Sequence, residues 1–156
     1  MSSLDQNTEA VALGAAVSDQ VSACARAPWR ILAVVAADDT VSSLWLAEAV
    51  ARQCTSAGQG AARAFGAEGL TGEGVSRQLE ELHALVKSGG RAVVAIGAMA
   101  GRRSGAPILA AADGALLCVQ LGLSTVKSAR RAVELIGRDR FVGAVTIERR
   151  PAGQRR

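Results

Sequence analysis

Short apolar runs alternate with helical stretches along most of this chain, and that alternation restricts the folds it can adopt. Five apolar runs are predicted strands: Arg30–Val35, Ala61–Gly66, Arg91–Ile96, Ala115–Gln120 and Phe141–Ile147. Helices are predicted before and between them: Thr8–Ala25, Val41–Thr55, Val75–Lys87, Ala106–Ala112 and Thr125–Ile136. Continuous apolar strands are typical of parallel strands buried on both faces. We therefore predict an α/β fold, a doubly wound and mostly parallel five-stranded sheet with helices on both faces.

The composition indicates a globular chain with an aliphatic core. Hydrophobic residues make up 49% of the 156 positions, aromatic residues only 3%, and tyrosine is absent. We expect one α/β domain over residues 28–148, an N-terminal helical segment over 1–27 that packs on it, and a basic disordered tail over 149–156. No apolar run approaches 18 residues, so no direct membrane span is predicted.

Neither the cysteines nor the basic residues point to a particular ligand. Cys24, Cys54 and Cys118 are far apart, and no CxxC or Cys/His cluster accompanies them, so no metal site is predicted. Free thiols of this kind are typical of a reducing compartment, and we expect a cytoplasmic protein. The net charge is +4, but the arginine-rich tail lacks the interleaved aromatic residues of a single-strand binder, and no nucleic acid is expected as a partner.

The segment after the first predicted strand reads Ala36-Ala37-Asp38-Asp39-Thr40. A nucleotide-binding α/β protein would have a glycine-rich loop here, whose backbone amides approach phosphate, together with a lysine. This segment has neither. We predict that Asp39 or Thr40 is the N-cap of the following helix, and that Asp38 and Asp39 stabilise the helix N-terminus and repel phosphate.

Several segments resemble one known family. Ser104–Val119 (SGAPILAAADGALLCV) is similar to the segment that follows the second catalytic loop of the bacterial tyrosine-kinase (BY-kinase) family. Leu46–Ala51 resembles its first helix, Ser124–Gly137 its arginine-rich helix, and Phe141–Val145 its final strand. These kinases are deviant P-loop ATPases related to the MinD/ParA group and serve capsular and exopolysaccharide synthesis. The resemblance spans residues 28–147 and implies a P-loop NTPase-like fold.

The catalytic positions of that family are replaced in this chain. Asp39 stands where the family has its phosphate-binding lysine, and Thr40 falls on the adjacent hydroxyl position. Ile96–Ala100 replaces the loop that would begin with a Mg²⁺-binding aspartate, and the tyrosine-rich tail has no counterpart. Phosphoryl transfer depends on neutralisation by lysine and Mg²⁺. The resemblance therefore implies a phosphate loop that is only vestigial (Asp38, Asp39, Thr40), with no catalytic residue and no cofactor.

The resemblance then implies a pseudokinase or pseudo-ATPase, not an enzyme, that acts by protein–protein contact. Its role would be regulatory or scaffolding in exopolysaccharide or cellulose-type polysaccharide synthesis or export. A membrane polysaccharide copolymerase or a synthase component would be the partner and would recruit the protein to the inner face of the membrane; homo-oligomerisation stays open. Two alternatives remain: a small-ligand-binding or enzymatic domain that uses the carboxyl edge of the sheet, and a ParA/RecA-like regulatory module that binds a cytoskeletal or DNA-associated partner.

Two basic surfaces are candidates for the partner contact. The first is the rim loop, Gly97–Gly105, which carries Arg102 and Arg103 and should lie at the carboxyl edge of the sheet. The second is the basic helix face formed by Lys127, Arg130 and Arg131. We favour the rim loop, because related ATPases use that edge for nucleotide and for neighbouring subunits.

Overall fold

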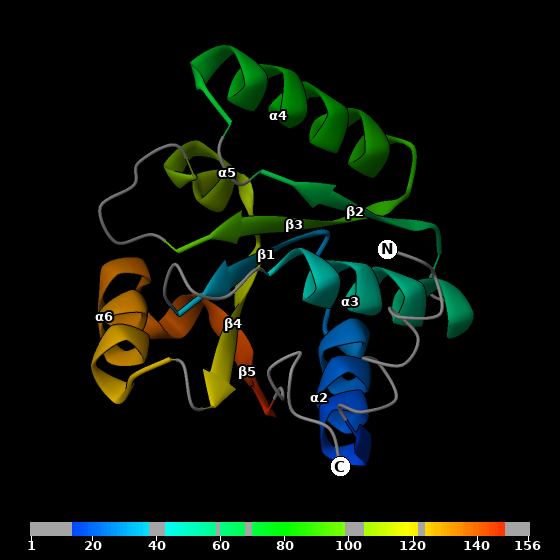
Figure 1. Cartoon of the computed structure of the whole chain (residues 1–156). Coiled ribbons are helices and arrows are strands. Elements are labelled where there is room, and N and C mark those ends of the chain that lie inside the picture. Colours follow the sequence, from blue (N-terminus) through cyan, green and yellow to red (C-terminus); the bar gives the residue numbers. More distant parts are fainter. Residues whose placement is uncertain are drawn as a thin grey trace, which may run out of the picture.

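In the residues that the structure describes, five parallel strands form one sheet in the order β2-β3-β1-β4-β5 (Figure 1). The computed structural model describes residues 14–37, 43–58, 60–67, 70–98, 105–121 and 124–148. The strands are β1 (Ile31–Ala36), β2 (Ala62–Gly66), β3 (Arg91–Gly97), β4 (Gly114–Leu121) and β5 (Phe141–Glu148). The predicted α/β class and parallel sheet are confirmed.

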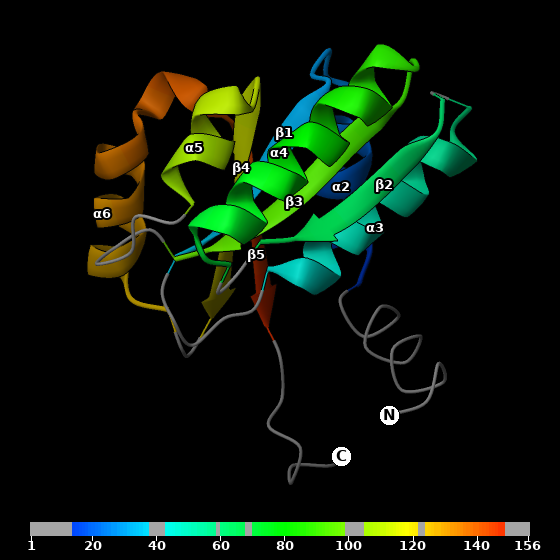
Figure 2. The ribbon, with the colours of Figure 1, turned by 90° about the horizontal axis from the view of Figure 1, so that it is seen from above.

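Helices cover both faces of this sheet (Figure 2). They are α2 (Gly14–Arg26), α3 (Leu44–Ser56), α4 (Gly72–Lys87), α5 (Ala106–Ala111) and α6 (Val126–Ile136), followed by the 3-10 turn η1 (Arg138–Arg140). α2 and α3 pack on one face, while α4, α5 and α6 pack on the other. This is the doubly wound arrangement expected when each crossover between parallel strands is right-handed.

The central strand explains why the apolar runs are continuous. All six residues of β1 are buried. Leu32, Val34 and Ala36 point into the cluster under α2 and α3. Ile31, Ala33 and Val35 point into the cluster under α4 and α5. Because successive side chains of a strand lie on opposite faces, a strand covered by helices on both sides must be apolar at every position.

The helix starts required two corrections. α3 begins at Leu44 with Ser43 in the N-cap position, so the expected start at Val41 and the expected cap at Asp39 or Thr40 are wrong. α6, expected from Thr125, begins at Val126 with Thr125 as its N-cap: the Thr125 hydroxyl accepts from the Ser128 N–H, and the Thr125 N–H donates to the Ser128 hydroxyl. Runs of Ser, Thr and Asp contain several residues able to cap, so the sequence alone does not fix which of them begins the helix.

The expected N-terminal segment is described only from Gly14, where α2 begins; it packs on α3. Residues 1–13 and the tail at 149–156 lie outside the described residues. Among the helices that the structure describes, none has both the length and the apolar character needed to cross a bilayer.

The order of the strands positions the candidate site. After β1, the next helix, α3, lies on one face of the sheet. After β3 and β4, the two strands beside β1, the next helices, α5 and α6, lie on the opposite face. The connections therefore diverge at the carboxyl end of β1. In open α/β sheets, ligands bind in the crevice at such a divergence.

Candidate functional site at the carboxyl edge of the sheet

At the carboxyl end of β1, the next residue, Ala37, is still hydrogen-bonded to the neighbouring strand. Ala37 is buried, and its N–H donates to the carbonyl of Cys118 at 2.9 Å. In a phosphate loop the backbone N–H groups after this strand must instead be available to the anion. The backbone N–H of the first residue beyond β1 is therefore already hydrogen-bonded within the sheet.

The end of β3, beside β1, is closed by small apolar residues. Ile96 and Ala98 are buried, and Gly97 has a φ of +73°. Glycine adopts this left-handed conformation without strain, and it turns the chain out of the strand toward the rim loop. The strand ends at Gly97 and is followed by Ala98, so no carboxylate stands at this strand end among the described residues.

On the other side of β1, the end of β4 is a hydrogen-bonded turn. The Gln120 N–H donates to the hydroxyl of Ser124 at 3.1 Å, and the Ser124 N–H donates back to the Gln120 carbonyl at 2.8 Å. The capping box of Thr125 and Ser128 follows at once. Polar groups at the start of α6 are therefore satisfied within the chain.

The segment predicted to be a vestigial phosphate loop (Asp38, Asp39 and Thr40) lies outside the described residues, and so do Arg102 and Arg103 of the rim loop. The structure nevertheless places the residues next to both segments. Ala37 precedes the first segment at the end of β1, and Ala98 lies before Arg102 at the end of the neighbouring strand. Ala37 and Ala98 therefore both lie at the carboxyl edge, at the ends of adjacent parallel strands.

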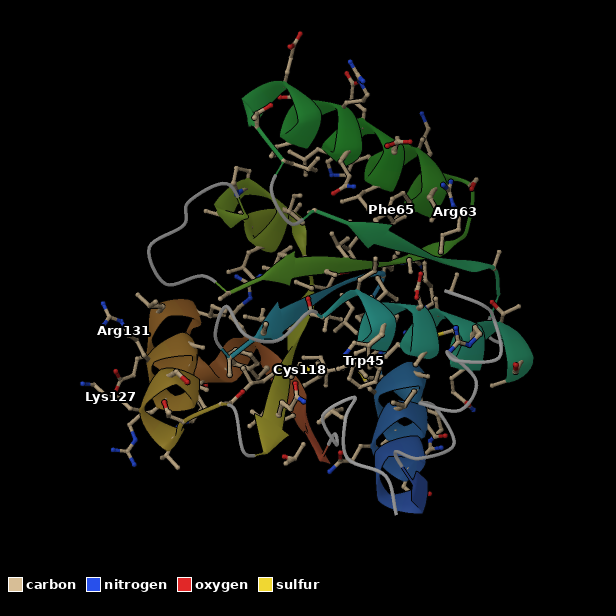
Figure 3. The ribbon with its side chains drawn as sticks, viewed as in Figure 1. Trp45, Arg63, Phe65, Cys118, Lys127 and Arg131 are labelled. Atoms are coloured by element: carbon tan, nitrogen blue, oxygen red, sulfur yellow. The ribbon has the colours of Figure 1, made fainter. Side chains whose placement is uncertain are left out.

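The predicted basic helix face is formed by α6. Lys127, Arg130 and Arg131 are all exposed, and Figure 3 shows Lys127 and Arg131 directed away from the body of the domain. Two large apolar side chains on the same helix are also exposed, Val126 at 74% and Leu135 at 57%. The structure thus brings the three predicted cations onto one outward helix surface with apolar residues at its flanks.

Among the described residues, the cation with the most hydrogen bonds lies at the opposite, amino edge of the sheet, and the sequence did not predict its role. Arg91, the first residue of β3, donates to the carbonyls of Trp29 at 2.9 Å and Ala25 at 2.8 Å, and also to that of Ala27. Its guanidinium carbon lies 3.7 Å from the centre of the Trp29 ring. These carbonyls follow or end α2, so Arg91 caps that helix and joins it to the sheet.

The cysteines are structural. All three are buried as free thiols. Burial raises the pKa of Cys24 to about 12 and that of Cys118 to about 12, and it also raises the pKa of Cys54. Thiols with such raised pKa values stay protonated near neutral pH and are poor nucleophiles and poor metal ligands. Within the described part of the chain, no cluster of His, Cys, Asp and Glu has the makings of a metal site.

Comparison with known proteins does not place the chain in a family. No family model matches it, and no curated protein matches it.

Proposed function

We propose that this chain is a non-catalytic relative of the BY-kinase and MinD/ParA-type ATPases, and that it acts by protein–protein contact. Its place would be in exopolysaccharide or cellulose-type polysaccharide synthesis or export. The partner would be a membrane polysaccharide copolymerase or a synthase component that recruits this cytoplasmic protein to the inner face of the membrane. The role is regulatory or scaffolding.

One observation carries this proposal: the two strand ends that would hold nucleotide in such an ATPase are built from other residues. After β1, the Ala37 N–H bonds to Cys118, and the next residues are Asp38 and Asp39 rather than glycine and lysine. After β3, the chain continues through Gly97 and Ala98 without an aspartate. Asp39 at the expected lysine position, together with Asp38 before it, repels a triphosphate, so the edge is better suited to a protein than to ATP.

Calorimetric titration with Mg-ATP tests the loss of nucleotide binding. We expect a dissociation constant weaker than about 1 mM, because both charge partners of the phosphates are replaced, and each tenfold in affinity corresponds to about 1.4 kcal/mol. Replacing Asp39→Lys should not create ATPase activity, since the Mg²⁺ carboxylate would still be missing. A dissociation constant near 10 µM for the wild-type chain would overturn the proposal (on the order of 7 kcal/mol of binding energy).

The partner surface is tested by charge reversal. Arg102→Glu with Arg103→Glu should abolish capture of the copolymerase or synthase component, while Arg130→Glu with Arg131→Glu should reduce it less. Both double variants should keep the wild-type circular dichroism, and the Arg130 and Arg131 variant, which changes exposed side chains, should alter the free energy of unfolding by at most about 0.5 kcal/mol. Loss of capture only in the Arg130 and Arg131 variant would identify the α6 face, not the rim loop, as the docking surface.

A further inference from the structure

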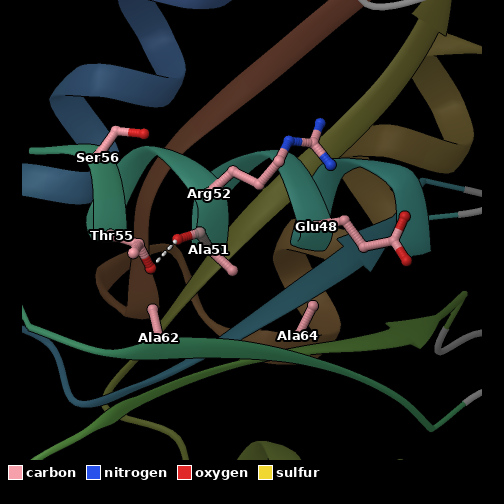
Figure 4. A pocket seen from close by; sticks show the side chains of 7 residues that line it. All are labelled: Glu48, Ala51, Arg52, Thr55, Ser56, Ala62 and Ala64. Carbon is pink, nitrogen blue, oxygen red and sulfur yellow. Dashed lines mark hydrogen bonds between the residues drawn. The ribbon is translucent and has the colours of Figure 1, made fainter. Parts of the chain in front are cut away.

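One edge of the sheet is formed by β2, which pairs with β3 on one side only (Figure 2). A groove of about 490 Å³ lies between this strand and α3. Ala51 of α3 points into it, opposite Ala62 and Ala64 of β2, while Glu48 and Arg52 extend from the helix along its rim (Figure 4). Because its floor consists of methyl groups, the groove leaves the backbone of the edge strand within reach of another chain.

The pairing with β3 decides which backbone groups face the open side. The Ala61 carbonyl accepts from the Arg91 N–H at 2.9 Å, and the Ala67 N–H donates to the Ala95 carbonyl at 2.8 Å. Odd-numbered residues of this stretch therefore direct their amide groups at β3. Amide direction alternates along a strand, so Ala62, Ala64 and Gly66 direct theirs at the open side.

We propose that this edge is a homodimer interface, in which β2 pairs antiparallel with β2 of a second copy about a two-fold axis at Ala64. In this register Ala64 faces the partner's Ala64, and Ala62 faces the partner's Gly66. All three have outward-directed amide groups, so they form the hydrogen-bonded pairs of an antiparallel ladder. The two five-stranded sheets join into one continuous sheet, and an isologous interface of this kind closes on itself.

The side chains on the α4 face of β2 favour this register. Arg63 lies with its guanidinium carbon 4.8 Å from the centre of its own Phe65 ring (Figure 3). About Ala64, Arg63 lies opposite the partner's Phe65, in the non-hydrogen-bonded pair where side chains approach most closely. A ladder centred on Arg63 would instead place two arginines directly opposite each other, which is destabilising. A ladder centred on Phe65 would leave Ala62 unpaired.

The α3 face supplies charge complementarity about the same axis. α3 packs over β2, so the two-fold axis brings the α3 helices of both copies side by side and antiparallel. Ala64 lies beneath Glu48, and the Arg52 side chain extends along the helix toward Glu48 (Figure 4). Each Glu48 therefore faces the partner's Arg52, and the pair forms twice. Within the described part of the chain, neither side chain has an ion-pair partner of its own.

An exposed apolar residue at the end of the groove fits the same arrangement. Leu44, at the start of α3, is 37% exposed. A Cβ placed on Gly66 would lie 3.7 Å from its Cδ1 atom. Since Gly66 pairs with the partner's Ala62, the partner strand covers Leu44 and removes its apolar surface from water.

The first test measures the mass of the full chain by sedimentation equilibrium over a range of concentrations. We expect a concentration-dependent mass that approaches twice 15.9 kDa. Ala64→Pro should remain monomeric with wild-type circular dichroism, because an edge strand tolerates proline where the N–H faces outward, but the ladder to the second copy loses its central bonds. Ala64→Ser keeps the N–H and serves as the matched control that still dimerises.

Charge exchange supplies a second test that does not depend on the folding of the proline variant. Glu48→Arg and Arg52→Glu should each raise the dimer dissociation constant about tenfold, because symmetry turns two opposite-charge pairs into two like-charge pairs. Both substitutions in one chain should restore the wild-type constant, and an equimolar mixture of the two single variants should form a heterodimer. A wild-type chain that stays monomeric, or a dimer that these charge exchanges leave unchanged, overturns the proposal.

Discussion

The two edges of the sheet are held together in different ways. At the amino edge, charged side chains make several bonds each: Arg91 binds carbonyls at the end of α2, and Asp113 Oδ2 accepts from the N–H groups of Arg30 at 2.8 Å and Ile31 at 3.0 Å. At the carboxyl edge, the ends of β1 and β3 are apolar and a backbone bond of Ala37 holds the first of them, while at the end of β4 the Ser124 hydroxyl accepts from an N–H only four residues away.

The amino edge therefore contributes mainly to stability, whereas the carboxyl edge is the candidate place for binding. Asp113 and Arg91 connect β4, β1, β3 and α2, so the amino edge carries side-chain bonds between elements far apart in the sequence. In the sequence, the segments that follow β1 and β3 lack the lysine and the aspartate of a nucleotide-binding pattern. In parallel α/β sheets the carboxyl edge is the usual place for binding, and the scaffold must be rigid elsewhere.

Of the substitutions at the two edges, replacing Arg91 should lower the free energy of unfolding most. Arg91→Ala leaves partly buried carbonyls of Ala25 and Trp29 without their donor and removes the contact with the indole ring. We expect a loss of about 3 kcal/mol in the free energy of unfolding, measured by urea denaturation. Arg91→Lys keeps the charge but not the planar guanidinium, so its free energy of unfolding should lie between those of the alanine variant and the wild type. Equal stability of the lysine variant and wild type would show that charge alone matters.

Replacing Asp113 should have an intermediate effect at the same edge. Asp113→Ala removes the acceptor of two backbone N–H groups, those of Arg30 and Ile31, and should cost about 1–2 kcal/mol by urea denaturation. Asp113→Asn retains a neutral acceptor oxygen and should cost less. If the two variants lost the same stability, the hydrogen bonds of this carboxylate would not be what joins β4 to β1.

The smallest change in the free energy of unfolding is expected for substitutions that follow β1 at the carboxyl edge. Because Ser43, not Asp39 or Thr40, occupies the N-cap position of α3, replacing Asp38 and Asp39 together with Ala should change the free energy of unfolding by at most about 0.5 kcal/mol. Thr125→Ala, which removes a cap hydrogen bond of α6, is the positive control and should cost about 1 kcal/mol. A loss above 1 kcal/mol in the Asp38 and Asp39 variant, roughly a full cap, would reinstate a capping role.

Strand positions were predictable almost to the residue. Arg91–Ile96 was predicted and Arg91–Gly97 is observed, because a strand covered on both faces can contain almost no polar side chain. Helix starts were less predictable: α3 begins three residues after Val41, within a stretch where Thr40, Ser42 and Ser43 are all chemically able to cap. The basic face of α6 was predictable because Lys127, Arg130 and Arg131 follow helical spacing.

The sequence by itself determined the class of fold, since its apolar periodicity leaves only a parallel sheet between helical layers. It also determined that no lysine follows the first strand and no aspartate directly follows the third, because these are residue identities at single positions. Only the tertiary structure decided the strand order, and with it that β2 is an edge strand. Only the tertiary structure brought Arg91 to carbonyls 62 and 66 residues away. Such contacts depend on how the elements pack in three dimensions, which local periodicity does not specify.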